Sequence, residues 1–185
     1  MKGTQTEKNL LIAFAGESKA RNVYQMFADV ARKEGYVKIA LVFEDVALHE
    51  ISHAKNFQKF FENTIVEINQ TVSVPMIGTT IENLKQAISG ELFEAETLYP
   101  QFAEIAKSEG FTKVASKFKL IANAEKYHLK LFKKYLQKLE SDSYFKNQES
   151  IEWYCIKCGY THFGENAPQE CPACNHPQAY FTTTE

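Results

Sequence analysis

Apolar residues recur every three or four positions along four stretches of this 185-residue chain, the spacing that gives a helix one buried face. The four stretches cover residues 5–33, 36–63, 79–110 and 112–139. Gly35 and Gly110 stand at the ends of the first and third stretches, and helices commonly end at glycine. The pattern predicts a mainly α fold built on a bundle of four helices.

A long connection separates the second and third predicted helices. Residues 64–78 are rich in β-branched side chains and contain Pro75, so they are too long for a tight turn. A connection of this length can cross a whole bundle, and the two helices that it joins then run parallel. Thr79 and Glu82 have the spacing of a capping box that opens the third helix.

Two Glu-x-x-His motifs occupy core-facing positions, Glu50 with His53 and Glu125 with His128. Residues three apart lie on one face of a helix, so each motif directs a carboxylate and an imidazole toward the same point. A bare carboxylate in a core is costly, and no Lys or Arg falls among the core-facing residues of these two helices. Each motif therefore reads as half of a metal site.

The first and third helices are two copies of one unit, residues 13–36 and 87–111. Glu91 follows Glu17 by 74 residues, whereas Tyr99 follows Tyr24 by 75. The second copy thus has one extra residue between Glu91 and Tyr99. A helix absorbs an extra residue most easily as a π-bulge, a feature frequent at functional sites.

The copies also differ in charge, because Glu94 stands where the first copy has Ala20. Seven candidate ligands result: Glu17, Glu50, His53, Glu91, Glu94, Glu125 and His128. Carboxylates with two imidazoles suit iron or manganese, and this set is typical of di-metal four-helix bundles. Tyr24 and Tyr99 face the same core. We expect their hydroxyls to bond ligand carboxylates, the alternative being aromatic core filling. His49 is expected at the surface.

All four cysteines lie near the end of the chain as two C-x-x-C pairs: Cys155, Cys158, Cys171 and Cys174. Four thiolates at this spacing form a tetrahedral site for iron or zinc. Spacing alone leaves open an electron carrier or a structural zinc ribbon. We expect three parts: a bundle over residues 1–140, a polar linker over 141–150, and a metal-stabilised module over 151–185.

Charge and composition exclude several classes of partner. A net charge of −2 and a pI near 6.2 give no footprint for nucleic acid or anionic membrane. The apolar run 10–15 is too short for a secretory signal and lies between Glu7 and Glu17. Clustered cysteines favour a reducing compartment, so we expect a cytoplasmic protein.

Nearly the whole chain resembles rubrerythrin. The resemblance rests on AGESKAR, SGELFEAE, AEKYH and WYCIKCGYTHFGENAPQECPACNHPQAYF. It implies a ferritin-like four-helix bundle with a long crossover between helices 2 and 3, followed by a small rubredoxin-like knuckle domain. The implied activity is that of a non-haem di-iron peroxidase, which reduces hydrogen peroxide to water and defends against oxidative stress.

The resemblance also implies how electrons arrive. They would pass through an Fe(Cys)₄ centre, supplied by rubredoxin and its NAD(P)H-linked reductase. Zinc can replace that iron in purified protein. The implied assembly is a homodimer or larger, in which the thiolate iron of one subunit serves the di-iron site of its neighbour.

Individual ligand roles follow from the same resemblance. Glu50 and Glu125 would bridge the two irons. Glu17 would bind one iron, and Glu91 and His128 the other.

The first iron would exchange Glu94 for His53 on reduction. The expected catalytic residues are thus Glu94, His53, Tyr24 and Tyr99.

Two other classes of protein stay open. A ferroxidase or iron-storage protein would use similar carboxylates but would not need the cysteine module. A non-enzymatic metal binder or electron carrier would leave the duplicated Glu-x-x-His motifs unexplained.

Overall fold

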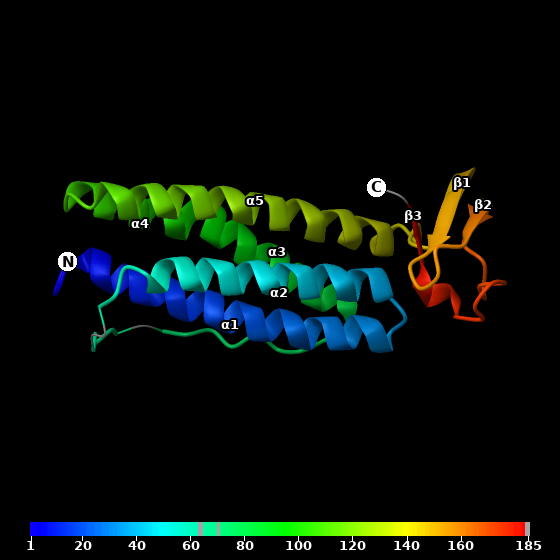
Figure 1. Cartoon of the computed structure of the whole chain (residues 1–185), viewed down its shortest axis with the longest axis horizontal. Coiled ribbons are helices and arrows are strands. Elements are labelled where there is room, and N and C mark those ends of the chain that lie inside the picture. Colours follow the sequence, from blue (N-terminus) through cyan, green and yellow to red (C-terminus); the bar gives the residue numbers. More distant parts are fainter. Residues whose placement is uncertain (63–64, 70, 184–185) are drawn as a thin grey trace.

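The computed structural model describes residues 1–62, 65–69 and 71–183. Over these residues the chain forms a long helical bundle with a small three-stranded domain at one end (Figure 1). The mainly α fold expected from the apolar spacing is confirmed. None of the described helices combines the length and apolar character needed to cross a membrane.

The first helical pair consists of α1 (Gln5–Lys33) and α2 (Val37–Gln58), which pack along one another as a hairpin. The turn between them uses Gly35 at φ 85°, a left-handed conformation that glycine adopts without a steric penalty. The N–H of Tyr36 donates to the carbonyl of Ala31 at 2.8 Å and closes the end of α1.

The third predicted helix is continuous but changes its winding. It comprises α3 (Thr80–Phe93), the π-helical turn η1 (Glu94–Leu98) and α4 (Tyr99–Ser108). The π turn falls where the repeat has its extra residue, so that prediction is confirmed. After Gly110, at φ 84°, the chain turns back into α5 (Thr112–Glu140), which packs on α3 and α4.

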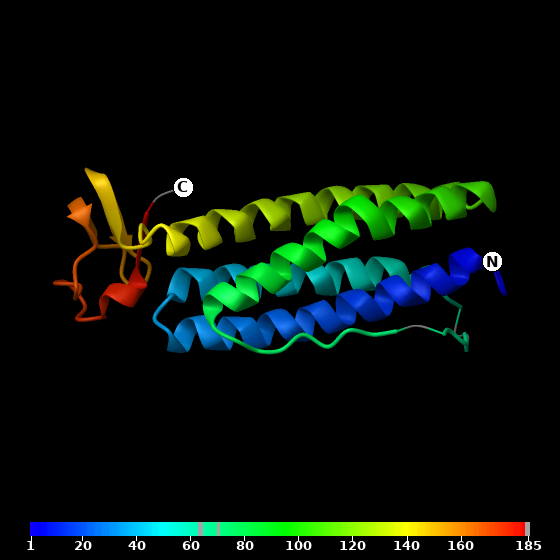
Figure 2. The ribbon, with the colours of Figure 1, turned by 180° about the vertical axis from the view of Figure 1, so that it is seen from behind.

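The second helix is shorter than expected. We expected it to reach Asn63, which lies outside the described residues, as does Thr64 at the start of the expected connection. Instead α2 ends at Gln58, where the backbone passes into a turn. Residues 71–79 run back along α1, so α2 and α3 are parallel (Figures 1 and 2). Lys19 Nζ donates to the Ser73 carbonyl at 3.3 Å and so holds this segment against α1. The predicted capping box of Thr79 and Glu82 is confirmed.

The bundle core is divided into two apolar clusters. One lies toward the α1–α2 turn and includes Tyr24, Phe27, Phe43 and Phe132. The other lies toward the opposite end and includes Leu10, Phe57, Tyr99 and Phe118. Glu17 of α1, Glu50 of α2 and the pair Glu125 and His128 of α5 fall between these clusters in the sequence. The polar layer is therefore closed off by packed side chains at both ends.

The C-terminal domain has three antiparallel strands in the order β2-β1-β3. They are β1 (Lys146–Cys155), β2 (Thr161–Asn166) and β3 (Phe181–Thr183), with the short 3₁₀ helix η2 (Gln178–Tyr180) before β3. The small core of this domain consists of Trp153, Ala167, Phe181 and two of the cysteines.

The stretch 141–150, expected to be a linker, is more ordered than its composition suggests. β1 already begins at Lys146, and the ring of Tyr144 packs edge-on against Tyr36 with centroids 5.1 Å apart. Ala179 Cβ also lies 3.8 Å from the position that a Cβ on Gly35 would occupy. Apolar contacts of this kind fix the domain against the α1–α2 end of the bundle.

Replacing Phe118 by alanine tests the packing of the second cluster. Phe118 is fully buried and its ring lies 5.2 Å from that of Phe57, so the substitution should lower the free energy of unfolding by about 3–5 kcal/mol. Leu120→Ala on the same helix is the control, because Leu120 is 63% exposed. Urea unfolding followed by helical circular dichroism measures both; equal losses would contradict this core assignment.

Candidate metal centres

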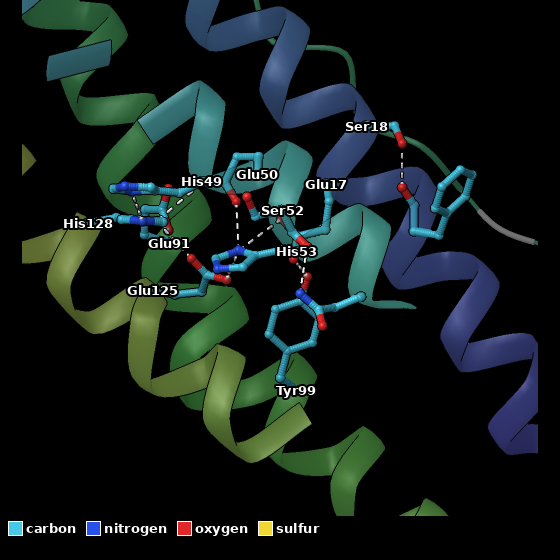
Figure 3. Close-up of polar contacts among 12 residues, drawn as sticks. Glu17, Ser18, His49, Glu50, Ser52, His53, Glu91, Tyr99, Glu125 and His128 are labelled. Atoms are coloured by element: carbon cyan, nitrogen blue, oxygen red, sulfur yellow. Dashed lines mark hydrogen bonds and ion pairs between the residues drawn. The ribbon is translucent and has the colours of Figure 1, made fainter. Parts of the chain in front are cut away.

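Four helical segments bring acidic side chains and histidines together in one layer (Figure 3). Glu17 comes from α1 and Glu91 from α3, whereas α2 and α5 each supply a Glu-x-x-His pair. We call these six residues the carboxylate layer: Glu17, Glu50, His53, Glu91, Glu125 and His128. Six of the seven candidate ligands therefore meet in one place.

The layer consists of two overlapping groups whose candidate ligand atoms lie within 4.8 Å of one another: Glu17, Glu50, His53 and Glu125, and then Glu50, Glu91, Glu125 and His128. Glu50 and Glu125 belong to both groups. A carboxylate has two oxygens, so one residue can face two metal ions. The arrangement is that of a two-metal site with two shared carboxylates.

Both histidines use Nδ1 toward the carboxylates. His53 Nδ1 lies 3.0 Å from Glu50 and 3.1 Å from Glu125. His128 Nδ1 lies 3.2 Å from Glu50 and 2.8 Å from Glu125. The same two carboxylates therefore stand between the two imidazoles.

The burial of the layer tests whether it fits metal ions. In the part of the chain that the structure describes, buried atoms without a hydrogen bond include Glu17 Oε2, Glu50 Oε1, Glu91 Oε2, both oxygens of Glu125, and His128 Nδ1. The ion pairs of these carboxylates, over the same residues, are all with the two histidines. Buried anions need compensating charge. Carboxylate oxygens with imidazole nitrogens suit divalent iron, so the residues fit the expected pair.

Glu94 stands apart from both groups. It begins the π turn and is partly buried, and its Oε1 lies 3.9 Å from where a Cβ on Gly16 would be. Of the two residues expected to exchange, His53 thus lies in a candidate ligand group, whereas Glu94 lies outside both groups and close to α1.

The tyrosine hydroxyls bond carboxylates of the layer, in a crossed pattern. Tyr24 Oη donates to Glu91 Oε1 at 2.5 Å, and Tyr99 Oη donates to Glu17. Each tyrosine is about 10 Å along its own helix from its own copy's glutamate, too far to reach it. Both rings also pack in the apolar clusters, so the two expected roles coexist.

Protons take the place of metal charge in the protein without ions. Burial raises the pKa of Glu91 to about 8, although the nearby imidazole of His128 opposes the rise. Burial disfavours a charged His128, but the close carboxylates of Glu125, Glu50 and Glu91 prevail and raise the pKa of His128 to about 12. The same balance, dominated by Glu125, Glu17 and Glu50, raises the pKa of His53 to about 12.

The four cysteines form a second centre, in the C-terminal domain. Their sulfur atoms lie within 4.8 Å of one another, with Cys155 and Cys174 at 3.8 Å and Cys158 and Cys171 at 3.7 Å. All four are free thiols. Gly159, at φ 78°, completes the turn after the first pair. Four convergent sulfurs fit one tetrahedral metal ion.

Comparison with known proteins agrees with both centres. Residues 8–136 match the family model described as rubrerythrin, and residues 153–182 match the rubrerythrin rubredoxin-like domain. The chain belongs to the rubrerythrin family. The carboxylate layer is therefore a candidate di-iron site, and the four cysteines form a rubredoxin-like site.

Rubrerythrins with high similarity span almost the whole chain. The rubrerythrin of Porphyromonas gingivalis is 48% identical over 98% of this chain and 90% of its own length. Rubrerythrin-1 of Clostridium acetobutylicum is 47% identical over 98% of this chain and 95% of its own length. The solved structure of all-ferrous nigerythrin aligns with TM-score 0.65 and 28% identity, covering 100% of this chain and 91% of the other.

Sequence reasoning missed one contact in this rubrerythrin-family site. His49 is exposed as expected, yet its Nδ1 lies 3.1 Å from His128 Nε2. Burial lowers the pKa of His49, and the charge of His128 adds to the effect. Helical spacing placed His49 about 100° from Glu50 and said nothing of a neighbouring helix. The available signal was the second ring nitrogen of a buried ligand histidine, which needs a partner of its own.

Metal loading of this rubrerythrin-family chain should release protons. His53, His128 and Glu91 hold protons near neutral pH in the metal-free layer, and a metal ion must displace them. Affinity for Zn²⁺ should therefore rise as the pH increases toward the Glu91 pKa at about 8. Calorimetry in two buffers of different ionisation enthalpy measures the protons released. Equal heats in both buffers, with pH-independent affinity, would contradict this prediction.

Proposed function

We propose that this chain is a non-haem di-iron peroxidase that reduces hydrogen peroxide to water. The observation that carries the proposal is the pair of buried ligand groups sharing Glu50 and Glu125. Hydrogen peroxide takes up two electrons and two protons to give two waters. The chemistry that two adjacent ferrous ions supply is both electrons together, which avoids a one-electron step to hydroxyl radical.

The protein's part is to hold two metal ions at a fixed separation in a dry layer. Glu50 and Glu125 would bridge, Glu17 would complete the first position, and Glu91 and His128 the second. The apolar clusters on either side limit the access of water. Hydrogen bonds from Tyr24 and Tyr99 would fix the outer carboxylates and remove some of their negative charge.

Exchange of His53 with Glu94 would match the charge of the site to its oxidation state. Replacing a carboxylate by a neutral imidazole removes one negative charge as the metal charge falls. The position of His53 Nδ1 among the carboxylates, with Glu94 outside both candidate groups, supports this proposal. The π turn supports this proposal, because it is a local irregularity at the residue that would move.

Electrons would return through the four-cysteine centre. This centre lies at the α1–α2 end of the bundle, and the helix from Val37 to Glu50 spans about 20 Å. A partner subunit could bring its own cysteine centre closer, so we propose a homodimer or larger assembly. Rubredoxin and an NAD(P)H-linked reductase are the proposed donors. We also propose a cytoplasmic location, because cysteines that hold a metal ion as thiolates suit a reducing compartment.

Stopped-flow mixing of the fully reduced, iron-loaded protein with one equivalent of hydrogen peroxide, without oxygen, tests the activity. The absorption of the thiolate iron should show fast oxidation, repeated turnover with a reductant, and a much slower reaction with dioxygen. Faster oxidation by dioxygen, or iron accumulation while the thiolate centre stays reduced, would replace the proposal with a ferroxidase.

Glu94→Ala should reduce peroxide turnover by about 10- to 100-fold, the range found when a group that tunes a metal site is removed. Helicity should be unchanged because Glu94 is only partly buried. Glu96→Ala is the matched control, since Glu96 lies in the same π turn but is exposed and pairs with Lys126 at 3.2 Å. Steady-state rates of peroxide reduction measure both variants. A wild-type rate in Glu94→Ala would refute the exchange of Glu94 with His53.

A further inference from the structure

The two histidines of the carboxylate layer differ in what holds them. The Nδ1 atom of His128 faces the carboxylates. Its Nε2 atom lies 3.1 Å from Nδ1 of His49. The imidazole rings of His49 and His128 are nearly parallel, with 9° between their planes and 5.2 Å between their centroids (Figure 3). Both nitrogens of His128 are therefore directed by specific partners, one toward the layer and one toward α2.

This geometry specifies where the hydrogen of a neutral His128 must lie. A neutral imidazole has one N–H, and the nitrogen that binds a metal ion must be bare. When Nδ1 binds a metal ion among the carboxylates, the one hydrogen of His128 lies on Nε2 and can be donated to Nδ1 of His49. The remaining nitrogen of His49 then carries its own hydrogen. The pair is thus consistent with two neutral rings.

We infer that His49 is a positioning residue, whose Nδ1 accepts from His128 Nε2 and fixes the tautomer and ring plane that present His128 Nδ1 to a metal ion. The inference rests on the proposed function, because it assumes that the layer binds metal. Partners of this kind commonly orient ligand histidines, and their loss lowers metal affinity by about 10- to 100-fold.

Among the described residues, a histidine partner of this kind supports His128 but not His53, its counterpart in the internal repeat. His53 corresponds to His128, and the residue corresponding to His49 is Ala124, which has no acceptor in its side chain. Among the described residues, the polar contacts of His53 are made by Nδ1, and its Nε2 has no hydrogen-bond partner.

A physical reason for the proposed exchange follows from this asymmetry. His128 is held at both ring nitrogens, so moving it would break the bond to His49 as well as its contacts with the layer. His53 is held at one nitrogen only and can leave without breaking a second hydrogen bond. His49 thereby makes His128 the fixed ligand and leaves His53 as the one that exchanges with Glu94.

Two substitutions at His49 separate the hydrogen bond from the bulk of the side chain. Asn places its Oδ1 close to where His Nδ1 lies and keeps an acceptor, whereas Leu has nearly the shape of Asn without one. The position is exposed, so neither change should disturb packing. Circular dichroism and thermal unfolding check that both variants fold like the wild type.

The test is Zn²⁺ binding to the full chain, with the cysteine site already holding iron, in competition with a chelator. His49→Leu should bind Zn²⁺ about 10- to 100-fold more weakly in the bundle, and His49→Asn should stay near wild type. Nitrogen-15 NMR of the Zn²⁺-loaded protein should show a hydrogen-bonded N–H at Nε2 of His128 in wild type and His49→Asn. This hydrogen bond should be lost in His49→Leu.

Each outcome bears on a separate conclusion. Equal Zn²⁺ affinities and equal His128 spectra for the Leu and Asn variants would overturn the role of His49. Absence of Zn²⁺ binding to the wild-type bundle would overturn the proposed function and this inference with it. Zn²⁺ is redox-inert, so a chain that binds it as expected but fails to turn over peroxide would leave the role of His49 intact.

Discussion

Four glutamates of the carboxylate layer are buried in the middle of a helical bundle without Lys or Arg partners among the described residues. Such a layer would be strongly unfavourable as bare anions, since each buried charge loses its hydration. Protons on histidine and glutamate can reduce the charge in the metal-free chain. Metal ions can also balance this charge, because the oxygens without hydrogen bonds converge in two groups that share Glu50 and Glu125.

The rest of the bundle packs around this layer. Apolar clusters close it on both sides along the helix axes. Tyr24 and Tyr99 each reach across to the glutamate of the other copy, so the two halves of the repeat are tied together through the layer. The fold and the site thus depend on the same contacts.

Function in a duplicated bundle depends on where the two copies differ. The second copy has Glu94 and a π turn, whereas the first has Ala20 and a regular helix. The third difference is His49 against Ala124, which leaves the two histidines with unequal support. Each departure acts at one position of an otherwise symmetric site. Under the proposed function, a symmetric frame would bind two ions while only one position changes its ligand.

The sequence by itself determined much of this protein. Core-facing spacing located the four helices and placed Glu50, His53, Glu125 and His128 on inward faces, because helical periodicity is a local property. The change of offset between Glu91 and Tyr99 located the π turn. Glycine at 35 and 110 marked the helix ends, and the cysteine spacing alone specified a four-sulfur site.

Only the tertiary structure decided which side chains meet. The crossed tyrosine bonds depend on the levels at which α1 lies beside α3 and α4, and His49 reaches His128 because α2 and α5 face each other there. The strand beginning at Lys146 also depends on a neighbouring element, because Lys146 pairs with Asn166 of β2. Periodicity specifies the face of a helix that is buried, but contacts between helices depend on their relative positions along the bundle, which no local pattern encodes.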